Sequence, residues 1–312
     1  MSERMNDDKT AQSEHTQRCG FAALVGAPNA GKSTLLNQLV GAKVSIVSRK
    51  AQTTRALVRG IAITGDAQII LVDTPGIFAP KRRLDRAMVS TAIAGATDAD
   101  VIALLIDARK GLDDEVLAII ERLQQTKQPK LLILNKIDLL QRDRLLALTA
   151  DINTRLKFEA TYMVSALNGD GVDDLRNGLA GMMQPGPWLY PEDQLSDAPL
   201  RLLAAEITRE KIYERLHDEL PYQSTVETDS WTNQKDGSAR IEQTIFVARD
   251  GQKKIVIGEG GRTIKAIGQA ARKEIEEAAE QKAHLFLFVK VRENWADDPE
   301  RYREMRLEFP KE

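Results

Sequence analysis

Five short apolar runs rich in valine, isoleucine and leucine alternate with stretches of helical spacing through the first part of the chain. The runs occupy residues 21–25, 69–72, 101–106, 131–134 and 162–164, and the helical stretches include residues 33–40, 114–125 and 142–156. Buried strands that alternate with helices predict an α/β fold, in which helices cover a mostly parallel sheet. Because ligands of such sheets bind at the carboxyl ends of the strands, the residues after each run are the candidates for a site.

The chain of 312 residues is long enough for two domains, each with its own core. The alternation stops at Met182, and the next stretch holds Pro185, Pro187, Pro191 and Pro199, which is too much proline for regular structure. We therefore expect a disordered N-terminus over residues 1–18, a first domain over 19–183, a linker over 184–199, and a second domain with a C-terminal tail over 200–312.

Composition narrows the function classes. With 42% hydrophobic and 29% charged residues, the chain has no apolar run long enough to cross a bilayer, and its first residues lack the apolar core of a secretory signal, which predicts a cytoplasmic protein. The single cysteine, Cys19, excludes an internal disulfide framework and a multi-cysteine metal site. The net charge is −2, so any nucleic-acid site has to come from a local cluster of basic residues.

A glycine-rich loop joins the first apolar run to the first helical stretch. It reads Gly26-Ala27-Pro28-Asn29-Ala30-Gly31-Lys32-Ser33, with Thr34 next, and matches the phosphate-binding loop. The glycines let backbone N–H groups surround phosphates, Lys32 supplies a cation for the β- and γ-phosphates, and Ser33 is predicted to bind Mg²⁺. The alternative is a plain glycine turn between strand and helix. The motifs that follow the later apolar runs make this alternative less favoured.

Three further motifs lie at strand ends. In Asp73-Thr74-Pro75-Gly76, the carboxylate can hold Mg²⁺ and the N–H of Gly76 can bind the γ-phosphate. In Asn135-Lys136-Ile137-Asp138, Asp138 can accept hydrogen bonds from the ring N–H and the exocyclic amine of guanine, a pair that adenine does not offer. In Ser165-Ala166-Leu167, a backbone N–H can bind the guanine carbonyl oxygen.

These four motifs, in this order, resemble the GTPase superfamily of translation-factor type over residues 20–183. The resemblance implies GTP and GDP as ligands, Mg²⁺ as cofactor, and a threonine between the first two motifs that binds Mg²⁺ when GTP is present. Thr54 is favoured for that role and Thr53 as its neighbour, although both read equally well as solvated loop residues without the flanking motifs.

The position after Asp73-Thr74-Pro75-Gly76 departs from the Ras-like pattern, because Ile77 stands where a glutamine would orient the attacking water. The chain is thus similar to GTPases in which a bound K⁺, held partly by a loop asparagine, compensates for the missing group, and Asn29 stands at that position. We expect slow intrinsic hydrolysis with Lys32, Asn29, Thr54 and Gly76 as the catalytic groups.

The second domain reads as αββααβ. Residues 200–216 have helical spacing, 223–231 and 240–248 suggest two strands joined by a turn, and helices at 253–257 and 262–281 flank a glycine turn before a last strand at 285–291. The turn Gly258-Glu259-Gly260-Gly261 resembles the Gly-x-x-Gly loop of a type II KH domain, which clamps about four nucleotides of single-stranded RNA.

The residues expected to contact RNA are those four together with Lys253, Lys254, Arg262 and Lys265. A simple helix-to-helix turn remains an alternative for the motif. Glu259 departs from the family pattern, because an anion in this loop repels a phosphate.

One GTPase domain, the segment Ser48-Arg49-Lys50-Ala51-Gln52-Thr53-Thr54-Arg55 and one C-terminal KH domain together resemble the Era family of bacterial GTPases. The resemblance implies binding to the 3′ end of 16S ribosomal RNA, a role in maturation of the 30S subunit, a cytoplasmic location with some peripheral association with the inner membrane, and no DNA partner. Two alternatives remain open: a constitutive RNA-binding protein with a structural nucleotide, and a GTPase whose C-terminal domain docks proteins.

Overall fold

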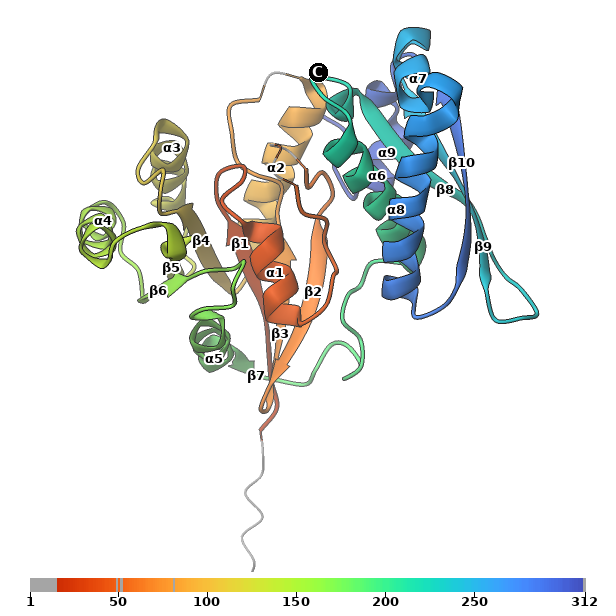
Figure 1. Ribbon diagram of the computed structural model, residues 1–312. Coiled ribbons are helices and arrows are strands. Elements are labelled where there is room, and N and C mark those ends of the chain that lie inside the picture. The colour runs from red at the N-terminus through yellow and green to blue at the C-terminus, as the bar shows by residue number, and fades with distance from the viewer. Residues whose placement is uncertain (1–15, 49, 51–52, 81, 311–312) are drawn as a thin grey trace, which may run out of the picture.

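The computed structural model describes residues 16–48, 50, 53–80 and 82–310, which form two lobes that lie side by side (Figure 1). The larger lobe is built on a seven-stranded sheet and the smaller one on a three-stranded sheet. No helix in these ranges is both long and apolar enough to cross a membrane.

The large sheet has the strand order β2-β3-β1-β4-β5-β6, with β7 paired to the start of β1. Strands β2 and β7 run antiparallel to their neighbours and the other pairs are parallel, which confirms the mostly parallel sheet. The strands are β1 (Arg18–Val25), β2 (Val58–Thr64), β3 (Ala67–Asp73), β4 (Val101–Asp107), β5 (Lys130–Asn135), β6 (Ala160–Val164) and β7 (Gln184–Pro185).

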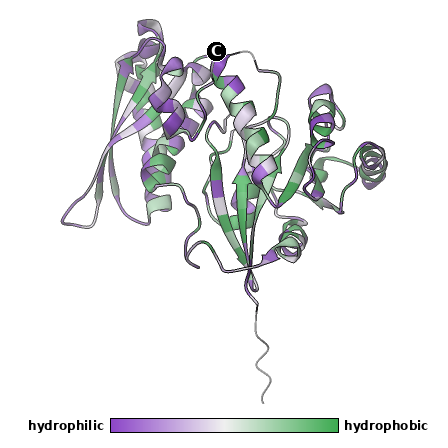
Figure 2. Ribbon diagram, turned by 180° about the vertical axis from the view of Figure 1, so that it is seen from behind, coloured by the Kyte–Doolittle hydropathy of each residue, from purple (hydrophilic) through white to green (hydrophobic). Residues whose placement is uncertain are grey.

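Helices cover both faces of this sheet. Helices α1 (Lys32–Val40) and α5 (Val172–Met182) pack on one face, and α2 (Arg83–Asp98), α3 (Asp114–Leu123) and α4 (Arg142–Arg155) pack on the other. Strands β4 and β5 are therefore buried along their whole length, as their apolar runs at residues 101–106 and 131–134 require, and Figure 2 shows the strands of this lobe mostly in green, the colour of hydrophobic residues.

The proline-rich stretch was expected to have no regular structure, but part of it forms a strand. Strand β7 pairs with Arg18 and Cys19, and Leu195 accepts a hydrogen bond from the N–H of Ile61 on the edge strand β2. The stretch therefore packs along the edge of the sheet. Strand β1 begins at Arg18, one residue inside the segment expected to be disordered, while residues 1–15 lie outside the described part of the chain.

The smaller lobe has the expected αββααβ order. Its elements are α6 (Leu200–Arg215), β8 (Ser224–Asn233), β9 (Ala239–Val247), α7 (Asp250–Ile257), the 3-10 turn η3 (Glu259–Gly261), α8 (Arg262–Ala279) and β10 (Ala283–Val291). Strand β9 is central, antiparallel to β8 and parallel to β10, and the helices cover one face of the sheet. This confirms a smaller α+β domain after the α/β domain.

The chain after β10 returns to the larger lobe, although it was expected to extend the second domain. The short elements η4 (Trp295–Asp297) and α9 (Pro299–Glu304) bring Trp295, Tyr302 and Leu307 into the apolar cluster that contains α2 and α3. The indole N–H of Trp295 also donates to the carbonyl of Gln223 at 3.0 Å in the smaller lobe. This C-terminal segment therefore ties the two lobes together.

Candidate nucleotide and RNA sites

The glycine-rich loop lies between β1 and α1, at the carboxyl end of the sheet. Gly31 has φ +102, and a Cβ there would lie 2.2 Å from Nδ2 of Asn135, so this position requires glycine. The same Nδ2 donates to the carbonyl of Ala30 at 2.8 Å. The first and third predicted motifs, more than a hundred residues apart in the sequence, are therefore locked to each other in the fold.

Lys32 is buried inside the loop. Its Nζ donates to the carbonyls of Gly26 and Ala27, both at 3.0 Å. Burial lowers the pKa of Lys32 to about 8, although the charge of nearby Asp73 acts in the opposite direction. An ammonium group with so little solvation has a strong electrostatic preference for phosphate oxygens.

The three residues predicted to bind Mg²⁺ lie together. The Oγ of Ser33 donates to Oδ2 of Asp73 at 2.7 Å and lies 2.8 Å from Oγ1 of Thr54. Burial raises the pKa of Asp73, and its Oδ1 is buried without a hydrogen-bond partner. Ser45, which sequence reasoning missed, also donates to Oδ2 of Asp73 at 3.0 Å, and no local pattern around Ser45 could have indicated this.

The loop after Asp73 packs against the phosphate-binding loop. A Cβ on Gly76 would lie 3.0 Å from Cα of Pro28, and the N–H of Ile77 donates to the carbonyl of Gly26 at 3.2 Å. The side chain of Ile77 is buried in the core of the lobe. Thr74 Oγ1 donates to the carbonyl of Leu24 at 2.8 Å and Pro75 is buried, so both of these predicted contact residues hold the loop in place. Ile77 therefore has neither the chemistry nor the orientation to position a water molecule.

The two motifs predicted to recognise guanine also meet. Ser165 Oγ donates to Oδ1 of the exposed Asp138 at 2.7 Å, which orients that carboxylate. The N–H of Ala166 is used by Oδ1 of Asn135 at 2.9 Å, and the neighbouring Leu167 is exposed. Two hydrogen bonds thus join the third predicted motif to the fourth.

Lys136, in the third predicted motif, contacts the phosphate-binding loop and the end of β4. Its Nζ donates to the carbonyl of Asn29 at 2.7 Å and to Oδ2 of Asp107 at 2.6 Å. Although burial opposes ionisation, hydrogen bonds from Arg109 and Lys136 hold the pKa of Asp107 below its usual range. Asp107 was missed by sequence reasoning, but its place at the end of β4 follows the same strand-end rule that found the other motifs.

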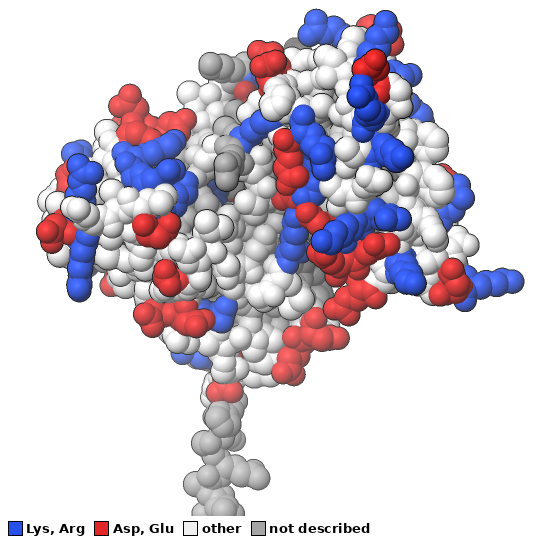
Figure 3. All heavy atoms as spheres, viewed as in Figure 1, with Lys and Arg blue, Asp and Glu red and all other residues white. Residues whose placement is uncertain are grey.

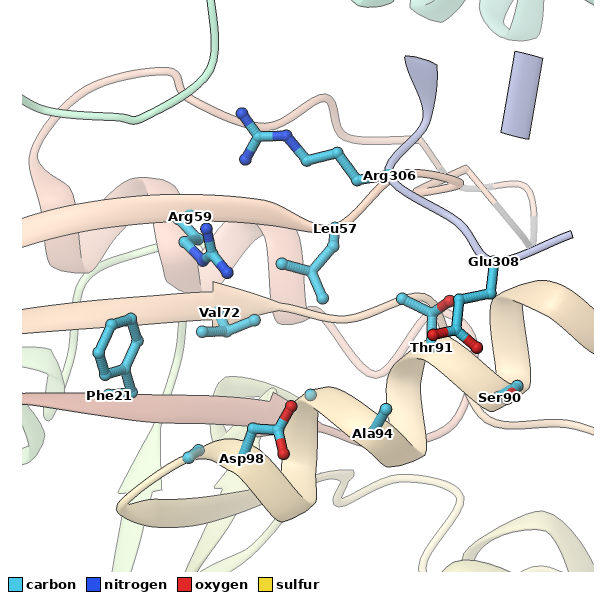
Figure 4. Close-up of a pocket in the computed structure, with 12 residues that line it drawn as sticks. Phe21, Leu57, Arg59, Val72, Ser90, Thr91, Ala94, Asp98, Arg306 and Glu308 are labelled. Carbon is cyan, nitrogen blue, oxygen red and sulfur yellow. The ribbon is translucent and has the colours of Figure 1, made fainter. Parts of the chain in front are cut away.

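Two cavities of the larger lobe differ in what lines them. A small one of about 60 Å³ is bounded by the phosphate-binding loop, Thr34, Gly76, residues 46–48, Thr53 and Thr54. Another, of about 330 Å³, lies between α2, the sheet and the C-terminal segment, where Figure 4 shows Arg59, Leu57 and Arg306 on one side and Ala94 and the carboxylate of Asp98 on the other. None of the predicted site residues lines this second cavity.

The loop between α1 and β2, which carries Thr54, packs directly on the smaller lobe. Ile46 is buried in the same apolar cluster as Ala204 and Ile207 of α6. The carboxylate of Glu210 accepts hydrogen bonds from Nζ of Lys43 at 2.5 Å and from the N–H of Val47 at 2.6 Å. Lys43 also pairs with Glu274 of α8, and Nζ of Lys50 donates to the carbonyls of Tyr213 and Leu216.

Arg55 is a buried link between the lobes. Its guanidinium donates to Ser224 O at 2.8 Å, Tyr213 OH and Tyr222 O at 3.0 Å, and Pro221 O at 3.3 Å. It also lies 5.6 Å from the ring centre of Trp295. The residue directly after Thr54 is therefore fixed to the smaller lobe and to the C-terminal segment at once.

The glycine turn of the smaller lobe joins α7 to α8, as predicted. Gly258 has φ +73, and a Cβ there would lie 2.2 Å from Oγ1 of Thr263, whereas a Cβ on Gly260 would meet open space. Lys254, Arg262 and Lys265 are exposed around the turn and Lys253 is half-buried. Lysine and arginine side chains gather on this side of the smaller lobe in Figure 3.

Glu259, the residue that departs from the family pattern, is not isolated in the turn. Its carboxylate pairs with Arg262 one helical turn later, and both side chains are strongly exposed. The carboxylate of Glu259 lowers the net positive charge of the turn, because it neutralises Arg262, one of the residues expected to contact RNA.

Family models match both lobes. The model described as 50S ribosome-binding GTPase matches residues 21–136, and the KH domain model matches residues 219–296. The glycine turn, α7, α8 and the three strands therefore belong to a KH domain, and the larger lobe is a P-loop GTPase domain. This confirms the predicted fold class.

Among similar proteins, GTPase Era of Afipia carboxidovorans is 68% identical over 308 residues, which are 99% of this chain and 100% of the relative. GTPase Era of Bradyrhizobium sp. strain BTAi1 is 69% identical over 295 residues, 95% of this chain and 96% of the relative.

Two solved structures share the architecture of both lobes. A variant of Aquifex aeolicus Era bound to GDP and AlF4⁻ has a TM-score of 0.86 and 38% identity, and Era in complex with MgGDPNP and nucleotides 1506–1542 of 16S ribosomal RNA has a TM-score of 0.87 and 38% identity. Each comparison covers 92% of this chain and 98% of the solved chain. With both domains matched and relatives similar over nearly the whole length, this chain belongs to the Era family of GTPases.

Proposed function

We propose that this protein is a GTP-driven timer that binds the 3′ end of 16S ribosomal RNA and assists maturation of the 30S subunit. The observation that carries the proposal is that the loop with Thr54, which lies beside the phosphate site, is also packed on the KH domain. Support for the ligands comes from the solved relative that holds MgGDPNP and 16S ribosomal RNA nucleotides. A nucleotide that reorders this loop would change the contacts that hold the KH domain.

In this proposal residues 26–34 surround the phosphates, and Asp138 with the backbone after Ser165 selects guanine. Ser33, Thr54 and Asp73 fit Mg²⁺, because they gather hard oxygen donors around a buried carboxylate oxygen that has no hydrogen-bond partner. Mg²⁺ takes only one or two protein carboxylates together with substrate phosphates, which suits this set. When bound, the ion would supply positive charge that offsets the negative charge of the phosphates.

Hydrolysis then depends on positioned charge instead of a water-orienting side chain. Lys32 stabilises negative charge on the phosphates, Gly76 donates its N–H to the γ-phosphate, and Thr54 keeps the loop closed. Because Ile77 is buried, we assign the missing charge stabilisation to K⁺, which suits the amide oxygen of Asn29 in the phosphate-binding loop. Turnover without K⁺ or a partner is expected to be slow.

The KH domain is assigned to single-stranded RNA, with the turn at residues 258–261 against the sugar-phosphate backbone. Gly260→Asp adds a side chain and an anion where the phosphates pass, so RNA binding should collapse while GTP affinity stays unchanged. Gly65→Asp is the matched control, because Gly65 also has positive φ and open space but lies in the GTPase domain.

Fluorescence anisotropy with a labelled RNA of the sequence 1506–1542 measures both variants in the GTP-analogue and GDP states. Equal RNA affinity for Gly260→Asp and wild type would contradict the clamp. Equal affinity in the two nucleotide states, with normal GTP turnover in K⁺, would favour a constitutive RNA-binding protein, and no RNA affinity at all would favour a protein-docking domain. The cytoplasmic location and the peripheral membrane association stay predictions.

A further inference from the structure

Ser45, in the loop between α1 and β2, is a buried serine whose polar groups all have partners. Its Oγ donates to Oδ2 of Asp73 at 3.0 Å. Its N–H donates to Oδ1 of Asn37 at 3.0 Å, and its carbonyl accepts a hydrogen bond from Nδ2 of the same side chain at 2.8 Å. Oδ1 of Asn37 also accepts the N–H of Val44 at 2.9 Å. The amide of Asn37 thus holds the backbone at residues 44–45 and fixes where the hydroxyl of Ser45 lies.

Helix α1 reaches the carboxylate of Asp73 by two routes. Ser33 and Asn37 are four residues apart on α1, so their side chains lie on the same face of the helix. Ser33 donates directly to Oδ2 of Asp73 at 2.7 Å, whereas Asn37 holds Ser45, which donates to the same oxygen. Two donors from different segments fix the orientation of this carboxylate. Oδ1 stays buried without a hydrogen-bond partner and is the oxygen available to a cation.

A Mg²⁺ site is sensitive to this kind of support. The ion requires near-ideal octahedral geometry, so a carboxylate that binds it has to be held in one orientation. Residues that hold a metal ligand through a hydrogen bond typically change metal affinity by about 10- to 100-fold when they are removed. The hydroxyl of Ser45 stands in this relation to Asp73, because it contacts the carboxylate from the side opposite in sequence to the phosphate-binding loop.

The residues on either side of Ser45 are held by the KH domain. Lys43 pairs with Glu210 of α6, Ile46 is buried against α6, and the N–H of Val47 donates to Glu210 at 2.6 Å. Figure 1 shows this loop between α1 and the helices α6 and α8. The hydroxyl of Ser45 therefore contacts the GTPase domain while its neighbours are anchored on the KH domain. If the KH domain moved away, the loop and the donor that it carries would lose this support.

We propose that Ser45 is a positioning residue for the Mg²⁺-binding carboxylate of Asp73, and that docking of the KH domain sets Mg²⁺ affinity through it. Ser45 holds Asp73, and Asn37 and Lys43 hold the loop of Ser45 from the two domains. The inference rests on the proposed Mg²⁺ site and adds the route by which the RNA-binding domain acts on it. The protein then retains Mg²⁺, and the nucleotide bound with it, less tightly when the KH domain is undocked.

The test measures how the release rate of a fluorescent GDP from the full-length protein depends on Mg²⁺ concentration. Ser45→Ala removes the hydroxyl, whereas Ser45→Cys keeps a side chain of similar shape with a much weaker donor. Ser238→Ala is the matched control, because Ser238 is also buried and donates to a carboxylate, that of Asp236 at 2.7 Å, but lies in the KH domain. Lys43→Gln tests the KH side of the route, and Asp73→Asn tests the Mg²⁺ site itself.

We expect Ser45→Ala and Ser45→Cys to raise the Mg²⁺ concentration for half-maximal retention of GDP by about 10- to 100-fold, with release in excess EDTA equal to that of the wild type. Lys43→Gln should shift this concentration in the same direction, and Ser238→Ala should leave it unchanged.

A wild-type Mg²⁺ dependence for Ser45→Ala would overturn the proposal. A wild-type dependence for Ser45→Cys alone would also overturn it, because only the shape of the side chain would then matter. Faster release in EDTA as well would assign Ser45 to packing of the loop, with the same consequence. A shift for Ser45→Ala without one for Lys43→Gln would overturn the route from the KH domain. An unchanged dependence for Asp73→Asn would show that the Mg²⁺ site itself is wrongly placed, which is a separate result.

Discussion

Replacing Arg55 by methionine tests whether the nucleotide loop and the KH domain act as one unit. The substitution keeps most of the side-chain volume but removes every hydrogen bond that the guanidinium donates. Pro221 O keeps a bond from Ser224 Oγ at 3.1 Å, and Tyr213 keeps its hydrogen bond with Arg209, so the main losses fall on the carbonyls of Ser224 and Tyr222.

Each buried acceptor left without a donor costs about 1–3 kcal/mol. Burial lowers the pKa of Arg55, because its charge is removed from water, and this desolvation cost offsets part of the stability that its hydrogen bonds contribute. We therefore expect the free energy of unfolding to fall by about 3 kcal/mol, which corresponds to a melting temperature lower by about 6–12 °C for lobes of this size. Arg155→Met, which removes an exposed ion pair with Asp151, should cost less than about 1 kcal/mol.

The functional readout is the ratio of RNA affinities in the GTP-analogue and GDP states. If coupling through Arg55 has the usual size, this ratio is about 5- to 150-fold in the wild type and falls toward one in Arg55→Met, while GDP affinity is retained. Thermal unfolding and anisotropy measure the two effects. A normal melting temperature together with an unchanged ratio would show that Arg55 is not a coupling element.

Three further predictions concern the nucleotide site. Asp138→Asn should weaken GTP binding by about a hundredfold and favour xanthosine triphosphate, because an amide cannot accept both guanine donors; an unchanged GTP affinity in calorimetry would refute the pocket. Hydrolysis should be faster in K⁺ than in Na⁺, and Asn29→Ala should remove that difference with little effect on GDP affinity; equal phosphate release in the two salts would leave Ile77 unexplained. Because burial lowers the pKa of Lys32 to about 8 and phosphates favour its charged form, binding above that pH requires proton uptake, so GTP affinity should fall by up to about tenfold between pH 8 and 9. Lys32→Met should flatten that profile, and a wild-type affinity constant across it would contradict the shift.

The strand-end motifs could be predicted from the sequence because each is a contiguous set of residues attached to a recognisable apolar run. The αββααβ order was accessible for the same reason. Strand β2 was missed because its apolar run, residues 61–63, is short and follows Arg59 and Gly60. It is also an edge strand, and local pattern does not reveal its pairing with β3.

The contacts between the lobes could not be predicted. Lys43 meets Glu210 and Glu274, which lie 167 and 231 residues away, and nothing in the neighbourhood of any of these residues indicates the partner. Ser45 beside Asp73 was hidden in the same way. Local sequence specifies the chemistry of the phosphate site, whereas its connection to the KH domain depends on tertiary packing.

The position of the C-terminal segment has a consequence for how the protein is made. Trp295, Tyr302 and Leu307 are synthesised after β10, the last strand of the KH sheet, yet they fill the apolar cluster against α2 in the GTPase domain. On a translating ribosome, the GTPase domain therefore keeps an unfilled apolar surface until the KH sheet and the segment after it have emerged. A chain that stops before Trp295 leaves α2 without this packing, so the GTPase core is complete only after the residues beyond the KH sheet have been made.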